Sequence, residues 1–216
     1  MAGILYLGMI VFGVIAQVIR SNILVFGDDI NTLERIGNSI LVLRLAFMSD
    51  ILMIVFYFLT AWTLYTILKN IHKNQSLLFL FFTIISVSIM SLNMINHAAI
   101  IEINDAAYFN INKQYDIYAL SQLFSKLHNY GYLIAQIFFG LWLFPLGNIL
   151  LKSKIMPKYF GIMLIAATFG CLLEVMVTFT FPQYGFIAYP GLIIAMSGEF
   201  SFCFWLLYKG IEVESK

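Results

Sequence analysis

Long apolar segments follow one another along the chain and are separated by short polar stretches. A helix needs roughly 20 apolar residues to cross about 30 Å of hydrocarbon. The pattern predicts six transmembrane helices, at about residues 3–19, 41–68, 77–101, 127–151, 159–181 and 187–208. We therefore expect an all-α fold, a polytopic membrane helical bundle, that forms a single integral-membrane domain over residues 1–216.

The charges of the polar connections alternate from one side of the predicted bundle to the other. Lysines follow the second, fourth and sixth spans: Lys69, Lys73, Lys152, Lys154, Lys158 and Lys209. Carboxylates dominate the opposite connections: Asp28, Asp29, Glu34, Glu102, Asp105 and Asp116. Since basic loops stay on the cytoplasmic side, the pattern predicts that both termini are cytoplasmic.

Composition agrees with this interpretation and narrows the partners. The chain is 62% hydrophobic and 11% charged, with a mean hydropathy of +0.91, which is typical of a lipid-embedded protein and not of a soluble domain. The net charge of +1 comes from scattered basic residues, so no nucleic-acid partner is expected. Cys171 and Cys203 fall inside apolar segments, where we expect no disulfide.

Two of the expected outer connections are long, at residues 20–38 and 104–126. The second interleaves aromatic with polar residues, which is typical of segments that lie at a membrane interface or form an aromatic belt. Arg20, just past the first span, is expected to extend its side chain to the interface.

Ionisable side chains inside the spans are the candidates for function, because a charge within the bilayer is costly. Once the spans are oriented, most of these side chains fall in the outer half of the membrane. They predict an outward-facing polar pocket whose candidate residues are Arg44, Asp50, Asn96, His97, His128, Tyr130, Glu174 and Glu199.

Helical spacing indicates which of these side chains can meet. Asn93, Asn96 and His97 follow at i, i+3 and i+4, so they share one face of the third span. Asp50 and Arg44 are poorly spaced for pairing on one helix, and we expect His97 or His128 to be the partner of Asp50.

Three functions fit this pattern. The first is binding or transport of a small solute, an ion or a lipid headgroup in the polar pocket. The second is an intramembrane zinc-type hydrolase, with candidate ligands His97, His128, Asp50 and Glu199, although no H-x-x-x-H or H-E-x-x-H spacing is present. The third is a scaffold or accessory subunit in which buried charges hold the helices in register. The sequence does not decide whether the protein is an enzyme, and it leaves any cofactor unknown.

Short runs along the whole chain resemble one family of bacterial membrane proteins. They include the run Leu127 to Tyr132, the turn from Pro157 to Gly161, and the pair Gly198 and Glu199 followed by the run Trp205 to Gly210. Further matches are Gly3 to Leu7, Arg20 with Ser21, Arg44 followed by Phe47, Ser49 and Asp50, and Phe139 to Leu141. On these residues the chain resembles the family called domain of unknown function 4386. The resemblance implies a multi-span protein of a bacterial plasma membrane and implies no reaction.

Overall fold

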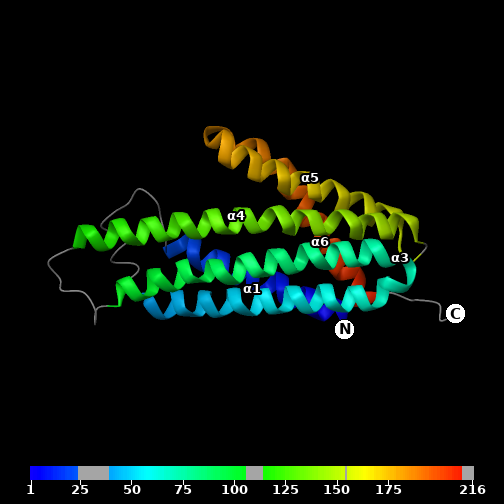
Figure 1. Ribbon diagram of the computed structural model, residues 1–216, viewed down its shortest axis with the longest axis horizontal. Helices are drawn as coiled ribbons and strands as arrows, with labels where there is room; N and C mark the ends of the chain where they lie inside the picture. Colours follow the sequence, from blue (N-terminus) through cyan, green and yellow to red (C-terminus); the bar gives the residue numbers. More distant parts are fainter. Residues whose placement is uncertain (24–38, 106–113, 154, 211–216) are drawn as a thin grey trace. The chain divides into compact units, whose positions relative to one another are not determined.

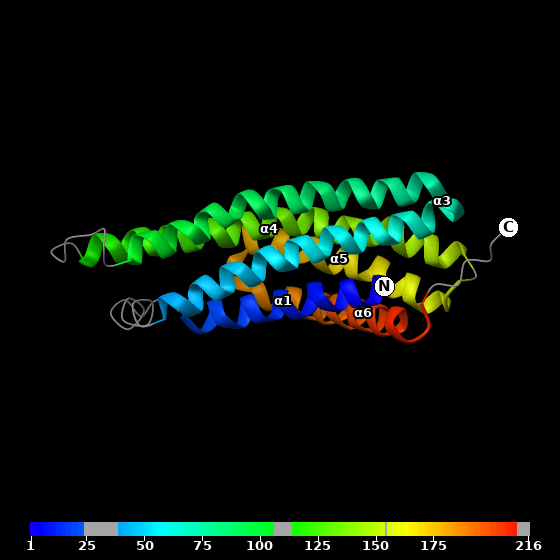
Figure 2. The same cartoon turned by 90° about the horizontal axis from the view of Figure 1, so that it is seen from below.

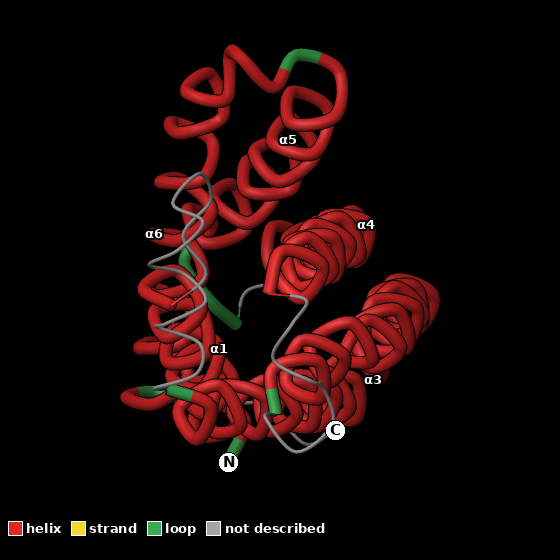
Figure 3. The backbone as a smooth tube through the Cα atoms, turned by 90° about the vertical axis from the view of Figure 1, so that its left-hand side faces the viewer, coloured by secondary structure: helices red, strands yellow, loops and turns green. Residues whose placement is uncertain are grey.

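The computed structural model describes residues 1–23, 39–105, 114–153 and 155–210. Figure 3 shows that these residues form helices joined by loops, with no strand among them, so the predicted all-α class is confirmed for this part of the chain. The helices are α1 (Ala2–Ile23), α3 (Ile40–Asn104), α4 (Gln114–Lys152), α5 (Lys158–Thr180), the 3-10 helix η2 (Pro182–Ala188) and α6 (Tyr189–Tyr208).

Within the described residues, five helical segments are long and apolar enough to cross a membrane, where the sequence predicts six spans. The difference arises in α3, whose 65 residues contain both the second and the third predicted span. His72, at φ −144° and ψ 80°, interrupts its helical geometry. Figures 1 and 2 show the chain reversing direction here, so that α3 is a helical hairpin.

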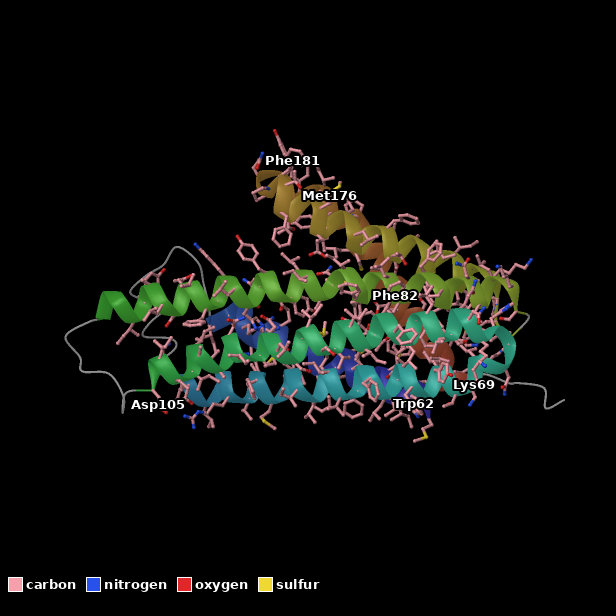
Figure 4. All side chains as sticks on the ribbon, viewed as in Figure 1. Trp62, Lys69, Phe82, Asp105, Met176 and Phe181 are labelled. Atoms are coloured by element: carbon pink, nitrogen blue, oxygen red, sulfur yellow. The ribbon has the colours of Figure 1, made fainter. Side chains whose placement is uncertain are left out.

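The break at His72 lies where the sequence changes character. Polar residues from Lys69 to Gln75 separate two apolar halves, so this stretch offers no apolar face that a neighbouring helix could bury. Neither proline nor glycine lies at the break. Figure 4 marks Lys69 close to the turn and Asp105 at the C-terminal end of the same helix.

The largest difference in a boundary concerns α4, which begins at Gln114 and not near Leu127. The stretch from Ile117 to Lys126 is too polar to be recognised as a membrane span by hydropathy, yet it is helical. Ser121 and Ser125 are buried on this stretch, and Ser121 accepts a hydrogen bond from Asn104 at 2.7 Å. Residues 24–38 and 106–113, which hold most of the two expected interfacial segments, lie outside the described residues.

The described helices divide into two compact units. Unit 1 comprises Met1–Leu7, Phe56–Ser88 and Leu133–Lys216, and unit 2 comprises Gly8–Val55 and Ile89–Tyr132. Each contains its own packed interior and is described separately below.

The interior of unit 1 is built around Trp142, whose side chain is fully buried. The rings of Tyr6, Tyr57 and Phe139 surround it at centroid distances of 6.1, 5.3 and 6.3 Å. Such tilted and edge-to-face arrangements are favourable for aromatic rings. This aromatic cluster joins α1, α3 and α4 within unit 1.

Glycines allow the helices of unit 1 to approach closely. A Cβ atom on Gly191 of α6 would lie 2.7 Å from Cα of Gly170 on α5, and one on Gly3 would lie 2.7 Å from the backbone nitrogen of Leu207. Contacts this short exclude any larger residue without movement of the backbone. The small residues Gly170 on α5 and Gly191 on α6 therefore form a packing face between these two helices.

The interior of unit 2 has an apolar part and a polar part. Ile23, Leu43 and Ile101 form the apolar part, with Ile19 and Phe47 packed against it. Beside Phe47 the interior becomes polar, at the ring of His97.

Candidate functional site

Five buried side chains meet in the interior of unit 2, and together we call them the polar centre. Arg20 comes from the last turn of α1, Asp50 from the first half of α3, Asn93 and His97 from its second half, and His128 from α4. Each of the five is at most 8% exposed. All helical segments that the structure describes in unit 2 thus contribute to one buried cluster.

Arg20 and Asp50 form a buried ion pair in the polar centre. Nη1 of Arg20 donates to Oδ2 of Asp50, and Nη2 donates to Oε1 of Gln17 at 3.1 Å. The prediction that Arg20 extends to the interface is therefore wrong for this structure. Arg20 lies in the interior because the carboxylate of Asp50 compensates the positive charge of its guanidinium, which apolar surroundings cannot do.

His97 stands next to the same carboxylate oxygen. Its Nδ1 lies 3.6 Å from Oδ2 of Asp50, and its ring meets those of Phe47 and His128 edge-on, each at a centroid distance of 5.6 Å. Both ring nitrogens of His97 and Nε2 of His128 lack a hydrogen-bond partner among the described residues. Buried polar atoms usually have partners, so these ring nitrogens make the polar centre a candidate binding site.

Asn93 holds His128 in position. Its amide nitrogen donates to the carbonyl oxygen of His128 at 2.8 Å and lies 3.3 Å from Nδ1 of the same residue. Asn96 donates to Oδ1 of Asn93 at 2.9 Å. A Cβ atom on Gly131 would overlap the side chain of Asn93, so a glycine on α4 is needed for this approach.

The polar centre offers the donor atoms of a metal site. One carboxylate oxygen of Asp50 and one ring nitrogen from each of His97 and His128 all lie within 4.8 Å of one another. Carboxylate and imidazole are ligands that suit zinc and related transition metals. The arrangement can therefore take up a small cation in the interior of unit 2.

The other candidate residues of unit 2 are not among these three donors. Arg44 forms an ion pair with Asp105 at 2.7 Å, in which both side chains are largely exposed. Tyr130 is 48% exposed. Asn96 reaches the centre through Asn93.

Glu174 and Glu199 belong to unit 1 and have partners there. Gln136 donates a hydrogen bond to Oε2 of Glu174. Tyr6 donates to Oε2 of Glu199 at 3.0 Å. Each carboxylate thus has a hydrogen-bond donor within its own unit.

Sequence reasoning missed Arg20 as a member of the centre, and it placed Asn93 on one face with Asn96 and His97 without making it a candidate residue of the pocket. Gln17 lies three residues before Arg20, at a spacing that lets the two side chains meet, but this spacing does not distinguish an arginine of the interior from one at the interface. For Asn93, the pairing depends on the approach of α4 at Gly131, which helical spacing within one span does not reveal.

Long apolar helices around a buried polar cluster define the class of this protein, an all-helical protein of the kind that crosses membranes. The chain belongs to the family described as "Domain of unknown function (DUF4386)", which it matches over residues 1–210. It is similar to an uncharacterised protein of Archaeoglobus fulgidus, with 32% identity over 159 residues that make up 74% of this chain and 80% of that protein. No solved structure matches the chain.

Proposed function

We propose that this protein is an integral membrane protein that binds a divalent transition-metal ion of the zinc class in the polar centre. Asp50, His97 and His128 are the protein ligands, and a water molecule or an exchangeable group completes the coordination. Three donors from separate helical segments leave such an ion a free coordination position, as in sites where zinc exchanges or activates a ligand.

The observation that carries this proposal is the set of buried, unpartnered ring nitrogens beside a carboxylate. Nε2 of His128 and both ring nitrogens of His97 have no hydrogen bond within the part of the chain that the structure describes. A bound cation would be coordinated by one ring nitrogen of each histidine and by a carboxylate oxygen of Asp50. The cation would thereby give a partner to buried ring nitrogens that have no hydrogen bond to the protein.

The spacing of the donors suits a small ion. Ligands about 2.0–2.2 Å from a tetrahedral zinc ion lie about 3.3–3.6 Å from one another. The three donors lie within 4.8 Å. Side-chain rotations that move each donor by roughly 1 Å would close that difference, a movement that the rotamers of Asp and His permit.

Burial favours an ion over a larger ligand. Asp50, His97 and His128 are 4%, 1% and 5% exposed, which leaves little surface that a solute, a lipid headgroup or a hydrolysable substrate could contact. We therefore place metal binding ahead of solute binding and of hydrolysis. The scaffold hypothesis predicts instead that the centre holds the helices together and has no affinity for metal.

We also propose six membrane spans, with both termini in the cytoplasm of a cell whose plasma membrane holds the protein. The two halves of α3 supply the second and third spans, since the chain reverses at His72. The lysine-rich connections support the orientation.

Isothermal titration of zinc into the purified, chelator-treated protein tests the proposed function. The wild type should bind one equivalent of zinc. His97→Gln and His128→Gln each remove a ligand, and each should weaken binding by more than about 100-fold, beyond the usual effect of changing a residue that only supports a ligand.

His72→Gln is the matched control. Of the three histidines in the chain, His72 is the one outside the polar centre, and it lies at the turn of α3 in unit 1. It should leave the affinity for zinc unchanged. Glu199→Gln should also bind zinc normally. If the wild type binds no zinc, or if both ligand variants bind as tightly as the wild type, the proposed function is wrong.

A further inference from the structure

The guanidinium of Arg20 contacts the carboxylate of Asp50 that a metal ion would need. Nη1 of Arg20 donates to Oδ2, and this is also the oxygen that lies 3.6 Å from Nδ1 of His97. The resident cation and the incoming ion therefore compete for one carboxylate group.

Electrostatics makes the two occupants mutually exclusive. A guanidinium and a dication that share a carboxylate in a buried, weakly screened interior repel each other strongly. Asp50 is the acidic member of the donor group, so one carboxylate must compensate either the guanidinium or the metal. Binding of the metal thus requires Arg20 to leave.

Arg20 has a second hydrogen-bond partner toward which its guanidinium can move. Nη2 of Arg20 already donates to Gln17, whose side chain is exposed on α1. Arg20 lies in the last turn of the same helix, so its long side chain can carry the charged group to the helix end while its stem stays on apolar surface.

We propose that Arg20 is the internal counter-ion of the metal site and that it determines which ions the site accepts. Resting on the proposed function, this inference assigns a selectivity role to a residue that is not itself a ligand. A monovalent ion such as Na⁺ replaces one unit charge by another and gains nothing from the imidazoles, so Arg20 excludes it. A zinc-class dication binds both imidazoles and displaces the guanidinium.

Zinc titration of Arg20→Gln tests this directly. Without the competing guanidinium, the variant should bind zinc at least about tenfold more tightly, as expected if only about a tenth of the wild-type molecules have Asp50 free. Arg44→Gln is the matched control, since it removes the same charge from the exposed pair with Asp105 in the same unit. Its affinity for zinc should stay within about twofold of wild type if only the shared carboxylate matters.

A second measurement uses the wild-type protein and does not depend on the folding of a variant. Phenylglyoxal modifies accessible guanidinium groups, and mass spectrometry locates the modified arginine. Zinc should increase the modification of Arg20 several-fold and leave that of Arg44 unchanged. Sodium chloride at matched ionic strength should have no such effect on Arg20.

The outcomes separate the two proposals. If the wild type binds zinc but Arg20→Gln binds it equally or more weakly, or if zinc fails to increase the modification of Arg20, the inference is overturned and the proposed function stands. If neither the wild type nor Arg20→Gln binds zinc, the proposed function fails and this inference fails with it.

Discussion

Asp50 and Arg20 compensate each other in the interior of unit 2, where Asp50 is 4% exposed and Arg20 is 8% exposed. Two ions removed from water lose their hydration, and their mutual attraction roughly offsets that loss only while both are present. The consequence is an asymmetry. Removal of one charge leaves the other buried and uncompensated, whereas removal of both leaves two neutral groups that can bond to each other.

That asymmetry gives a prediction at the scale of single residues. In chelator, Asp50→Asn should lower the free energy of unfolding by about 3–5 kcal/mol, the usual cost of breaking a buried pair. The double variant Asp50→Asn with Arg20→Gln should recover a large part of that loss. Unfolding measured in detergent checks both values.

The exposed pair Arg44 and Asp105 provides the control. Asp105→Asn should change stability by less than about 1 kcal/mol, since water screens this pair. A double variant at Arg20 and Asp50 that is less stable than both single variants would contradict this account of the buried pair.

Part of the polar centre was predictable from sequence at this scale. The cost of charge within a span identifies Asp50 and His97, and helical spacing excludes a good pairing of Asp50 with Arg44 on one helix. Arg20 was not predictable in this way, because an arginine at the end of a span is compatible both with the interface and with the interior. Its environment depends on the position of α1 against α3, which is a tertiary property.

At the scale of elements, the helices follow from apolar runs, and their ends follow less well. Hydropathy detects residues that contact lipid, so it finds the apolar part of α4 and misses the turns between Gln114 and Lys126. It also divides α3 into two spans, which agrees with the interruption of α3 at His72. The polar turns of α4 are helical although they lie outside its apolar run.

The contact between α5 and α6 gives a prediction at this scale. Gly191→Ala would place a Cβ atom 2.7 Å from Cα of Gly170, and the backbone there can relieve the overlap only by separating the two helices. The substitution should lower the free energy of unfolding by about 1–3 kcal/mol, as overpacking usually does. Thermal unfolding in detergent measures the effect.

Gly185→Ala is the matched control for that measurement. Gly185 lies on η2, where a Cβ atom would have no neighbour within 4 Å among the described residues, and its backbone requires no positive φ. It should leave the stability of the protein unchanged. Equal effects of the two substitutions would show that the close contact of Gly170 and Gly191 does not limit stability.

At the scale of the whole molecule, orientation in the membrane follows from the sidedness of the charges. Lys73 lies on a connection predicted to be cytoplasmic and Glu102 near one predicted to be outside, and both side chains are exposed. With Cys171 and Cys203 replaced by serine, Glu102→Cys should react with an impermeant maleimide in intact cells. Lys73→Cys should react only after the membrane is permeabilised, and the opposite pattern would reverse the proposed topology.

The chain belongs to a family whose function is unknown. Its function is therefore inferred from the polar centre. The metal donors of the polar centre come from three helical segments that are far apart in the sequence, so they do not form a short sequence motif. From residue types alone, the sequence predicts His97, His128, Asp50 and Glu199 as candidate metal ligands. The folded chain brings the three donors together in unit 2, and it assigns Glu199 to unit 1, where Tyr6 donates to its carboxylate.

X-ray absorption at the zinc edge of the zinc-loaded protein tests the central claim most directly. The account predicts one retained zinc ion with nitrogen and oxygen ligands at about 2.0–2.2 Å and the multiple-scattering signal of two imidazoles. A first shell that contains sulfur at about 2.3 Å would assign the metal to Cys171 or Cys203. Such a shell, or a protein that retains no zinc, would contradict the assignment of the metal to Asp50, His97 and His128.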